Sequence, residues 1–477
     1  MISRRMLLAG LGACAVSAAA AREPAAADAV YDVVVAGGGG AGLAAAVSAA
    51  QYGASVCLIE KLPMLGGDTL RSTGYFSCVE PRRQTAQGIE DSLELHFLQT
   101  VQAGGSLGDP KVIECMVREA PETVAWLERC GVLFHETVYE IYGAGHRRCL
   151  KPVLPRGTAY VRALAKTAAE LNVRTMLETA LTGIDFDAAG RAVGVTVRNA
   201  AGVTFPIAAR KSVVLACGGF GANAAKIARY APVLAGLPTD NSPGSTGDAL
   251  ALARRYGIAL KGLEYVECVA GNPPGHKTHA RLFLPADFVM VNEYGERFVE
   301  EDALRSELTE AILRQPNRRC FTVFDMQGVE HLDPISQKGL YQALVADEAL
   351  RADTLEELAE LMRVPADRFR REVGRYNERS GARGSVENKC TRIGCTPLKE
   401  APFWAYEVGL TIHYTPGGIV VDEFGRVLTE KGDVVQGLWA AGEVTGSVHG
   451  ANRLGGNGLA DAFTFGRLTG AAAAQNG

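Results

Sequence analysis

The segment from residue 32 to 61, DVVVAGGGGAGLAAAVSAAQYGASVCLIEK, constrains the fold more than any other part of the chain. Residues 33–35 form a β-branched run bounded by glycines, which is typical of a strand buried on both faces. An Ala-rich stretch over residues 43–52 predicts a helix, and residues 55–59 predict the next apolar strand. The order of strand, helix and strand predicts a βαβ unit.

Three glycines, Gly37, Gly39 and Gly42, join the first strand to the helix in the pattern G-x-G-x-x-G. They permit a tight turn, close approach of a pyrophosphate and close helix–strand packing, and the helix start offers free N–H groups. Glu60 follows about 20 residues later, where a carboxylate can accept hydrogen bonds from an adenosine ribose. A Gly-rich turn in another α/β domain is the alternative, but strand, helix and acid together favour a dinucleotide site.

Two later segments offer more backbone to the same cofactor. Residues 65–75, LGGDTLRSTGY, follow the acid-tipped strand, although such a loop can also be a plain surface loop. Residues 211–221, KSVVLACGGFG, predict a buried strand that ends in glycines. A further helix is predicted to begin near Asp248. The residues predicted to contact the cofactor are then Gly37, Gly39, Gly40, Ala41, Gly42, Glu60, Lys61, Gly66, Gly67, Asp68, Thr69, Gly74, Gly218, Gly219 and Asp248.

Residues 1–28 predict an export signal rather than part of the fold. Arg4 and Arg5 form a twin-arginine pair before an apolar run and small residues that suit cleavage between about residues 18 and 27. The run is too short for a membrane span, and an ordinary apolar helix is the alternative. The sequence LGAC also resembles a lipoprotein box, which leaves lipid anchoring at Cys14 open. We expect a periplasmic or otherwise extracytoplasmic protein.

Composition indicates an ordinary globular protein with two domains. A chain of 477 residues is too long for one core, and 47% of it is hydrophobic and 21% charged. The net charge of −4 provides no basic footprint for nucleic acid. The eleven cysteines contain no C-x-x-C, which excludes a c-type haem attached through C-x-x-C-H and ferredoxin-like spacing. Cys390 and Cys395 flank a loop and are candidates for a disulfide.

The rest of the chain divides into two parts. Residues 185–207 predict a small β-meander, and the character changes after about residue 262, where charged and aromatic residues increase and helices shorten. Strand-like, Gly-rich sequence returns near the C-terminus. We expect an α/β fold with a Rossmann-like dinucleotide-binding domain over residues 29–262 and 406–477, and an inserted α+β domain over residues 263–405.

Six segments occur in the order of a known family: DVVVAGGGGAGLAAA, EKLPMLGGDT, VVLACGGFG, IHYTPGGI, GLWAAGEVTG and VHGANRLGGNGLADAFTFGR. Over residues 32–471 the chain resembles the FAD-binding subunits of fumarate reductases and succinate dehydrogenases. It is most similar to soluble flavocytochrome-type fumarate and urocanate reductases, without their haem domain. The resemblance implies that FAD lies extended in the first domain and that a mobile capping domain closes over it.

The resemblance also assigns the C-terminal cofactor contacts. It implies that Glu443, beside Gly442, holds the FAD ribityl hydroxyls, and that residues 455–459, with Gly458 and Leu459, line the pyrimidine end of the flavin. Family members with covalent FAD carry a histidine in the loop after the βαβ unit. Residues 68–75 contain none, so we expect FAD to be bound non-covalently.

Three residues match the catalytic positions of the family. In this family, flavin N5 delivers hydride to the β-carbon of an alkene conjugated to a carboxylate, and an arginine protonates the α-carbon. By the resemblance that arginine lies eight residues after Arg297 and is Arg305 in this chain. His413 and Arg453 match the substrate-binding histidine and arginine, and an arginine fork suits a carboxylate. From the residues alone, Arg305 could be a surface residue, His413 part of a core pair and Arg453 a salt-bridge residue. We expect His449 to play a local structural part near the FAD.

The chain departs from the family at the far end of the site. Fumarate reductases hold the second carboxylate of fumarate with a histidine and a threonine. Counted back from Arg297 without gaps, those two family positions are occupied here by Cys268 and Ala280, and the positions of the family's proton-relay pair by Arg281 and Leu284. Only a gapped alignment brings His276 or His279 into register, and re-protonation of Arg305 would need other groups, such as Glu300, Glu301 or Asp302. We therefore expect an enoate reductase whose substrate has one carboxylate and a different, for example aromatic, far end, with fumarate less favoured.

Electrons must come from outside, since no haem or iron–sulfur motif accompanies the flavin. We expect a membrane-linked or soluble cytochrome as donor, in anaerobic respiration. One rival is a dehydrogenase that forms a C=C bond, of ketosteroid Δ1 or succinate type; the ketosteroid relatives lack the paired H-x-T-x-G-G and NRLGGN elements. Another is a flavin electron-transfer or sensor module, against which Arg305, His413 and Arg453 argue together.

Overall fold

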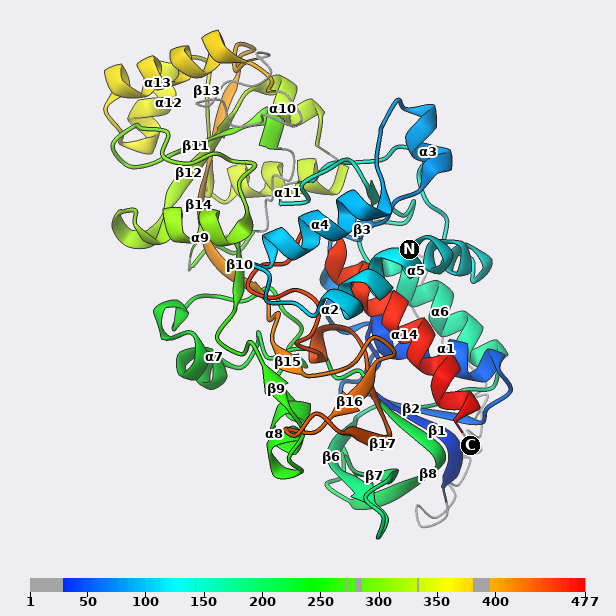
Figure 1. The fold of residues 1–477 in the computed structure, drawn as a ribbon. Coiled ribbons are helices and arrows are strands. Elements are labelled where there is room, and N and C mark those ends of the chain that lie inside the picture. The colour runs from blue at the N-terminus through cyan, green and yellow to red at the C-terminus, as the bar shows by residue number, and fades with distance from the viewer. Residues whose placement is uncertain are drawn as a thin grey trace, which may run out of the picture.

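The computed structural model describes residues 29–476 apart from 142, 272, 274, 279–284, 333 and 381–394. The export signal, Cys14, Cys390 and His279 lie outside the described residues, as do Ala280, Arg281 and Leu284. The chain forms a larger lobe and a smaller one, joined by strands that run between them (Figure 1). No helix in the described part of the chain is long and apolar enough to cross a membrane.

A mainly parallel sheet forms the centre of the larger lobe. Its strand order is β16-β17-β8-β1-β2-β5, with an antiparallel β6-β7-β8 meander at one side that confirms the predicted one. The buried, β-branched β1 pairs in parallel with β2 and β8, as expected for a central strand. The strands are β1 (Val30–Ala36), β2 (Val56–Ile59), β5 (Arg174–Met176), β6 (Thr179–Phe186), β7 (Ala192–Asn199), β8 (Thr204–Leu215), β16 (Arg426–Leu428) and β17 (Val434–Ala440).

Helices cover one face of this sheet, and the meander with α8 (Asp248–Arg255) covers the other. The covering helices are α1 (Gly40–Gln51), α5 (Pro110–Arg129), α6 (Thr158–Glu170) and α14 (Asn457–Gln475). α1 and α14 lie side by side at the centre (Figure 1). Gly466 and Gly470 face the backbone of α1, which lets the two helices approach closely.

Shorter elements connect these layers. They are α2 (Gly67–Arg71), β3 (Phe76–Ser77), α3 (Pro81–Ala86), α4 (Leu93–Ala103), β4 (Cys149–Leu150), α7 (Ala224–Tyr230), β9 (Leu260–Lys261) and β15 (Gly418–Ile419). β9 pairs with β15, so the chain leaves the larger lobe beside the place where it returns.

The smaller lobe, called the cap below, is an antiparallel sheet with helices on both faces. Its strand order is β10-β14-β12-β11, and β13 also pairs with β14. The strands are β10 (Glu267–Gly271), β11 (Val289–Val291), β12 (Cys320–Phe324), β13 (Ala349–Ala352) and β14 (Phe403–Tyr414). The helices are α9 (Arg305–Leu313), α10 (Met326–Glu330), α11 (Pro334–Val345), α12 (Leu355–Met362) and α13 (Ala366–Arg379).

Strand β14 carries the cap sheet into the larger lobe. It pairs with β10, β12 and β13, and its last residues, His413 and Tyr414, reach the cleft described below. The predicted domain boundary between residues 405 and 406 falls inside this strand. One long strand thus ties the cap to the site.

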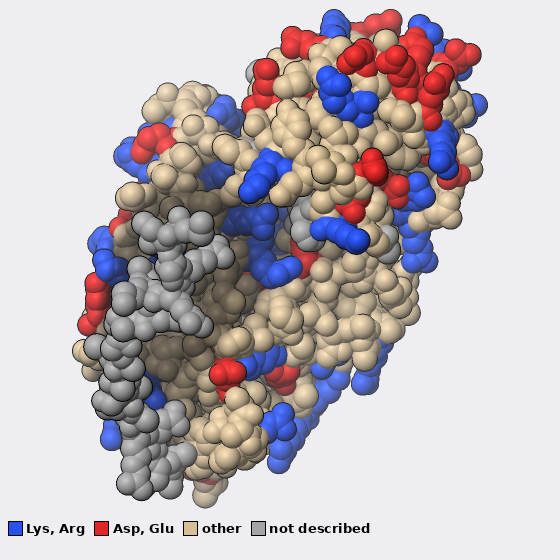
Figure 2. All heavy atoms as spheres, turned by 180° about the vertical axis from the view of Figure 1, so that it is seen from behind, with Lys and Arg blue, Asp and Glu red and all other residues tan. Residues whose placement is uncertain are grey.

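Figure 2 shows the opposite side of the molecule, where acidic side chains gather at the outer end of the cap and basic side chains lie near the hollow between the lobes.

Candidate active site

A cleft runs along the carboxyl ends of the central strands and on to the cap. Its lining includes Gly37, Gly39, Gly40, Ala41, Glu60, Lys61, Gly67, Asp68, Thr69, Gly74, Gly218, Asp248, Glu443, Gly458 and Leu459, which are predicted cofactor residues, and Arg305, His413 and Arg453. The structure therefore brings the predicted cofactor and catalytic residues into one continuous cleft. Contact with the cofactor itself remains a prediction.

Four predicted cofactor residues lie just behind the lining. A Cβ on Gly42 would overlap the carbonyl oxygen of Gly37, one on Gly219 would overlap Thr415 and Glu443, and Gly442 packs against Ala41 in α1. Gly66, whose φ of +126° favours glycine, precedes the first residue of α2. These glycines shape the cleft wall because a side chain at any of them would crowd a neighbouring residue.

The start of α1 suits a pyrophosphate. Gly39 precedes the helix without a side-chain cap, and a Cβ there would meet nothing within 4 Å. The N–H of Gly40 donates to Thr69 Oγ1 at 3.0 Å, which brings α2 against the same end of α1. Uncapped N–H groups at the positive end of a helix attract phosphate oxygens, so this end of the cleft fits an anionic group.

Polar residues continue the cleft beyond β2. Glu60 is 8% exposed, and its carboxylate accepts from the N–H of Gly38 at 2.7 Å and of Leu62 at 2.8 Å. These bonds hold the carboxylate at the end of β2, where the remaining lone pairs can accept from ribose hydroxyls. Lys61 Nζ contacts Asp248 Oδ2 at 2.7 Å, which ties this strand end to α8. The adenosine end of a dinucleotide fits here.

Two acidic side chains lie deeper in the cleft. Glu443 accepts from the N–H of Thr415 at 2.9 Å and from its hydroxyl at 3.0 Å. Burial, followed by the negative charge of Asp68, raises the pKa of Glu443 to about 8. Burial also raises the pKa of Asp68, which accepts from Ser242 N–H and Ser245 Oγ. A protonated Glu443 can both donate to and accept from a polyol chain.

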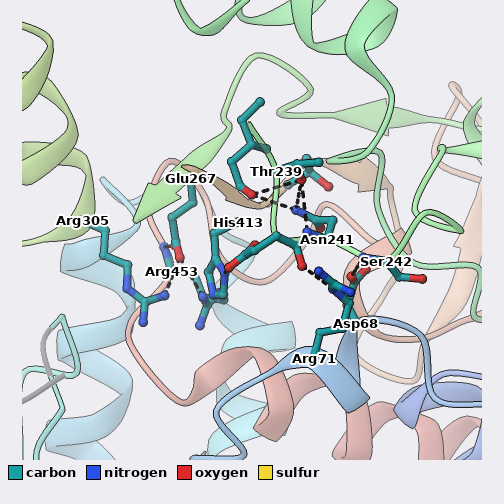
Figure 3. Close-up of polar contacts among 12 residues, drawn as sticks. Asp68, Arg71, Thr239, Asn241, Ser242, Glu267, Arg305, His413 and Arg453 are labelled. Atoms are coloured by element: carbon teal, nitrogen blue, oxygen red, sulfur yellow. Dashed lines mark hydrogen bonds and ion pairs between the residues drawn. The ribbon is translucent and has the colours of Figure 1, made fainter. Parts of the chain in front are cut away.

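Two arginines meet at the cap end of the cleft (Figure 3). Arg305, the first residue of α9, donates from Nη1 to Glu267 Oε1 at 2.5 Å. Arg453, in the loop before α14, donates from Nη2 to the same oxygen at 2.6 Å. Both arginines are buried, at 6% and 5% exposure. Arg305 is therefore not a surface residue, and a carboxylate lies between it and Arg453.

His413 is held at the same end of the cleft by Asp240. Nδ1 of His413 lies 3.0 Å from Asp240 Oδ2, and the backbone oxygen of Asp240 accepts from Arg71 Nε at 2.6 Å (Figure 3). The next residue, Tyr414, lies under the guanidinium of Arg453, with 4.4 Å between its ring centroid and Cζ. β14 thus positions His413 directly, and Arg453 through Tyr414, at this end of the cleft.

His449 has a structural environment. Its Nε2 lies 3.2 Å from Asp461 Oδ2, and its ring packs edge-on against Tyr414 with 5.6 Å between centroids. It is 2% exposed and does not belong to the cleft lining. His449 therefore supports Tyr414, which in turn supports Arg453.

Sequence reasoning missed Glu267 and Asp240. Glu267 begins β10 and faces the arginines, whereas the next residue, Cys268, is 1% exposed in the apolar core of the cap. A single carboxylate at the start of an otherwise apolar strand was the signal for Glu267. Nothing local distinguished Asp240, in the loop TDNSPGS, from an ordinary turn aspartate.

Two other residues considered for the far end of the site, His276 and Glu301, contact neighbouring residues of the cap. His276 packs edge-on against Tyr406 with 5.9 Å between ring centroids. Glu301, a predicted relay group, accepts from Arg297 Nη2 at 3.1 Å and from the N–H of Met290 at 2.7 Å. Arg305 contacts the carboxylate of Glu267. Relay through Glu300, Glu301 or Asp302 remains an untested prediction.

Comparison with known proteins identifies the cofactor. Residues 32–459 match the family described as "FAD binding domain". The chain belongs to this family. FAD is therefore the cofactor, and the uncapped α1 start, Glu60 and Glu443 would suit its pyrophosphate, ribose and ribityl parts.

The relatives are named as an acrylate oxidoreductase and as fumarate and urocanate reductases. The chain is 32% identical to the NADH:acrylate oxidoreductase of Vibrio harveyi over 91% of its own length, but spans 49% of that protein. It is 33% identical to a cytochrome-type fumarate reductase of Shewanella frigidimarina, covering 91% of this chain and 75% of that one. It is 31% identical to a urocanate reductase of Eggerthella lenta, covering 91% and 73%. The family is thus one of FAD-dependent oxidoreductases.

A solved structure supports the same fold. The open conformation of a flavocytochrome c3 fumarate reductase superimposes with a TM-score of 0.74 at 29% identity, covering 94% of this chain and 79% of that one. The α/β fold with an FAD-binding domain and a cap is therefore confirmed.

Proposed function

We propose that the protein is an FAD-dependent reductase of an alkene conjugated to a single carboxylate. The observation that carries the proposal is the convergence of Arg305, Arg453 and His413 at the end of the cleft that Gly458 and Leu459 line. When bound, FAD supplies the hydride. The names of the relatives, which include acrylate, urocanate and fumarate reductases, support reduction of a conjugated alkene.

Different residues bind the substrate carboxylate and supply the proton. Arg453 binds the carboxylate and draws electron density from the alkene, while Tyr414 holds the plane of its guanidinium. His413, oriented by Asp240, contributes a second contact to that carboxylate. Arg305 holds the proton that the α-carbon receives. An arginine is a weak acid, so a proton must be restored to it after each turnover, while the carboxylate of Glu267, 2.5 Å away, holds its guanidinium in place.

The far end of the site favours a substrate with one carboxylate. Cys268, at the position predicted for a carboxylate-binding histidine, is buried in the cap core, and burial raises its pKa to about 12. A neutral thiol in an apolar core cannot hold a second carboxylate. An acrylate with an apolar or aromatic far end fits better than fumarate.

Anaerobic turnover of an alkene panel with reduced viologen tests this function. We expect acrylate or aryl-acrylate turnover, and an R305A variant should lose at least about 10²-fold in kcat while it retains FAD. R314A removes an exposed arginine at the end of the same helix and serves as the control. Robust fumarate turnover without aryl-acrylate turnover would contradict the substrate. Unchanged function in R305A would favour an electron-transfer module.

We further propose that the enzyme works outside the cytoplasm with non-covalent FAD and an external cytochrome donor. The twin-arginine pair, the lack of a histidine in residues 68–75 and the lack of haem or iron–sulfur motifs support these points. Replacing Arg4 and Arg5 by lysine should retain the protein in the cytoplasm, which cell fractionation would show. Acid precipitation should release the flavin into the supernatant, whereas flavin that stays with the pellet would disprove non-covalent binding.

A further inference from the structure

A buried carboxylate of the protein lies between the two site arginines. Glu267 Oε1 accepts from Arg305 and Arg453 at 2.5 and 2.6 Å, and Oε2 accepts from the backbone N–H of Arg453 at 3.3 Å (Figure 3). Its side chain is 2% exposed. Charge-assisted contacts to two guanidinium groups hold such a carboxylate firmly. Glu267 therefore already occupies one hydrogen-bond donor of each arginine.

The charges around Glu267 leave a place for one more negative group. Burial by itself would raise the pKa of Glu267, but the positive charges of Arg453 and Arg305, with that of His413, outweigh it and hold this pKa below its ordinary value. The carboxylate is thus ionised at neutral pH. His413 faces its own carboxylate partner, Asp240. Counted over Arg305, Arg453 and Glu267 alone, one positive charge remains.

The donors of Arg453 are partly occupied as well. Nη2 donates to Glu267, and Nη1 donates to the carbonyl oxygen of Leu454 at 3.2 Å. Nε is buried and has no hydrogen-bond partner within the described ranges. The guanidinium stands beside Gly458, and the ring of Tyr414 covers one of its faces. A ligand carboxylate must therefore share the fork of Arg453 with Glu267.

Resting on the proposed function, we propose that Glu267 is the residue that restricts this site to alkenes with one carboxylate. A single substrate carboxylate cancels the remaining positive charge. A second one would meet the negative charge of Glu267 where little water can reach, and burying an unpaired charge is strongly unfavourable. The far end of the substrate is then neutral or a hydrogen-bond donor, and dicarboxylates such as fumarate are excluded by charge.

Binding of the saturated products to the FAD-loaded protein, read from the change in flavin absorbance, tests the role of Glu267 without requiring turnover. We expect the wild type to bind propionate or 3-phenylpropionate at least about tenfold more tightly than succinate. The E267Q variant keeps the shape of the side chain and removes its charge. Its affinity for succinate relative to propionate should rise at least about tenfold. E264Q removes an exposed carboxylate three residues earlier and should leave this ratio unchanged.

Two results would overturn the proposal. One is wild-type protein that binds succinate as tightly as the monocarboxylates; the other is FAD-loaded E267Q with the wild-type ratio. The wild-type comparison needs no variant, so the proposal is testable even if E267Q does not retain FAD. The alkene assay is separate: absence of alkene turnover would refute the proposed function, whereas the binding ratios decide the role of Glu267.

Discussion

Replacing Gly466 by alanine should push α14 away from α1 and weaken FAD binding without touching the cofactor. A Cβ on Gly466 would lie 2.5 Å from the carbonyl oxygen of Ala41 and 2.8 Å from Ala44 Cβ. A Cβ essentially never lies closer than 3.0 Å to another atom, so the helices must separate by at least about 0.5 Å. Alanine gains about 0.5–1 kcal/mol in helix propensity, but overpacking costs about 1–3 kcal/mol. We expect a net loss of about 1–2 kcal/mol in the free energy of unfolding.

Thermal unfolding with saturating FAD and a flavin fluorescence titration would measure this effect. One kcal/mol corresponds to about 2–4 °C in a lobe of this size, so Tm should fall by about 2–8 °C. FAD affinity should fall as well, because both helices begin at the cleft. The control is G374A in α13, where a Cβ meets nothing within 4 Å and Tm should stay or rise. An unchanged Tm and FAD affinity in G466A would refute the role assigned to this packing.

Two further predictions concern acidic residues in the cleft. Because the pKa of Glu443 is raised from 4.5 to about 8, the folded apoprotein binds a proton that the unfolded chain has released. Its free energy of unfolding should therefore fall as pH rises from about 4.5 to about 8, by up to about 1.4 kcal/mol per pH unit, and E443Q should flatten this slope in urea titrations. D240N should loosen His413 and raise KM for the alkene about tenfold at unchanged FAD content; an unchanged KM in steady-state kinetics would contradict that positioning role.

The sequence by itself determined the cofactor domain, because the signals of that domain are local. Strand, glycine turn, helix and acid lie within residues 32–61, and the structure places β1, α1 and β2 there. Each step depends on neighbouring residues: β-branched residues favour the strand, and close backbone contacts admit only glycine at Gly42. Family motifs then led to Arg305, His413 and Arg453, which the structure brings to one cleft.

Only the tertiary structure decided what surrounds the two arginines. Counting back from Arg297 placed Cys268 at the ligand position, whereas in the structure Glu267 faces the site and Cys268 the cap core. Successive residues of a strand point to opposite sides, and the register of β10 against β14 is irregular between these two residues. A difference of one residue therefore exchanges a thiol for a carboxylate.

The contacts that define the site join residues far apart in the chain. Glu267 lies 38 residues from Arg305 and 186 from Arg453, and Asp240 lies 173 residues from His413. Such pairs form only when β10 pairs with β14 and the cap meets the larger lobe. Local patterns carry no information about these pairings, because the free energy that selects them comes from burial and charge pairing in the folded chain.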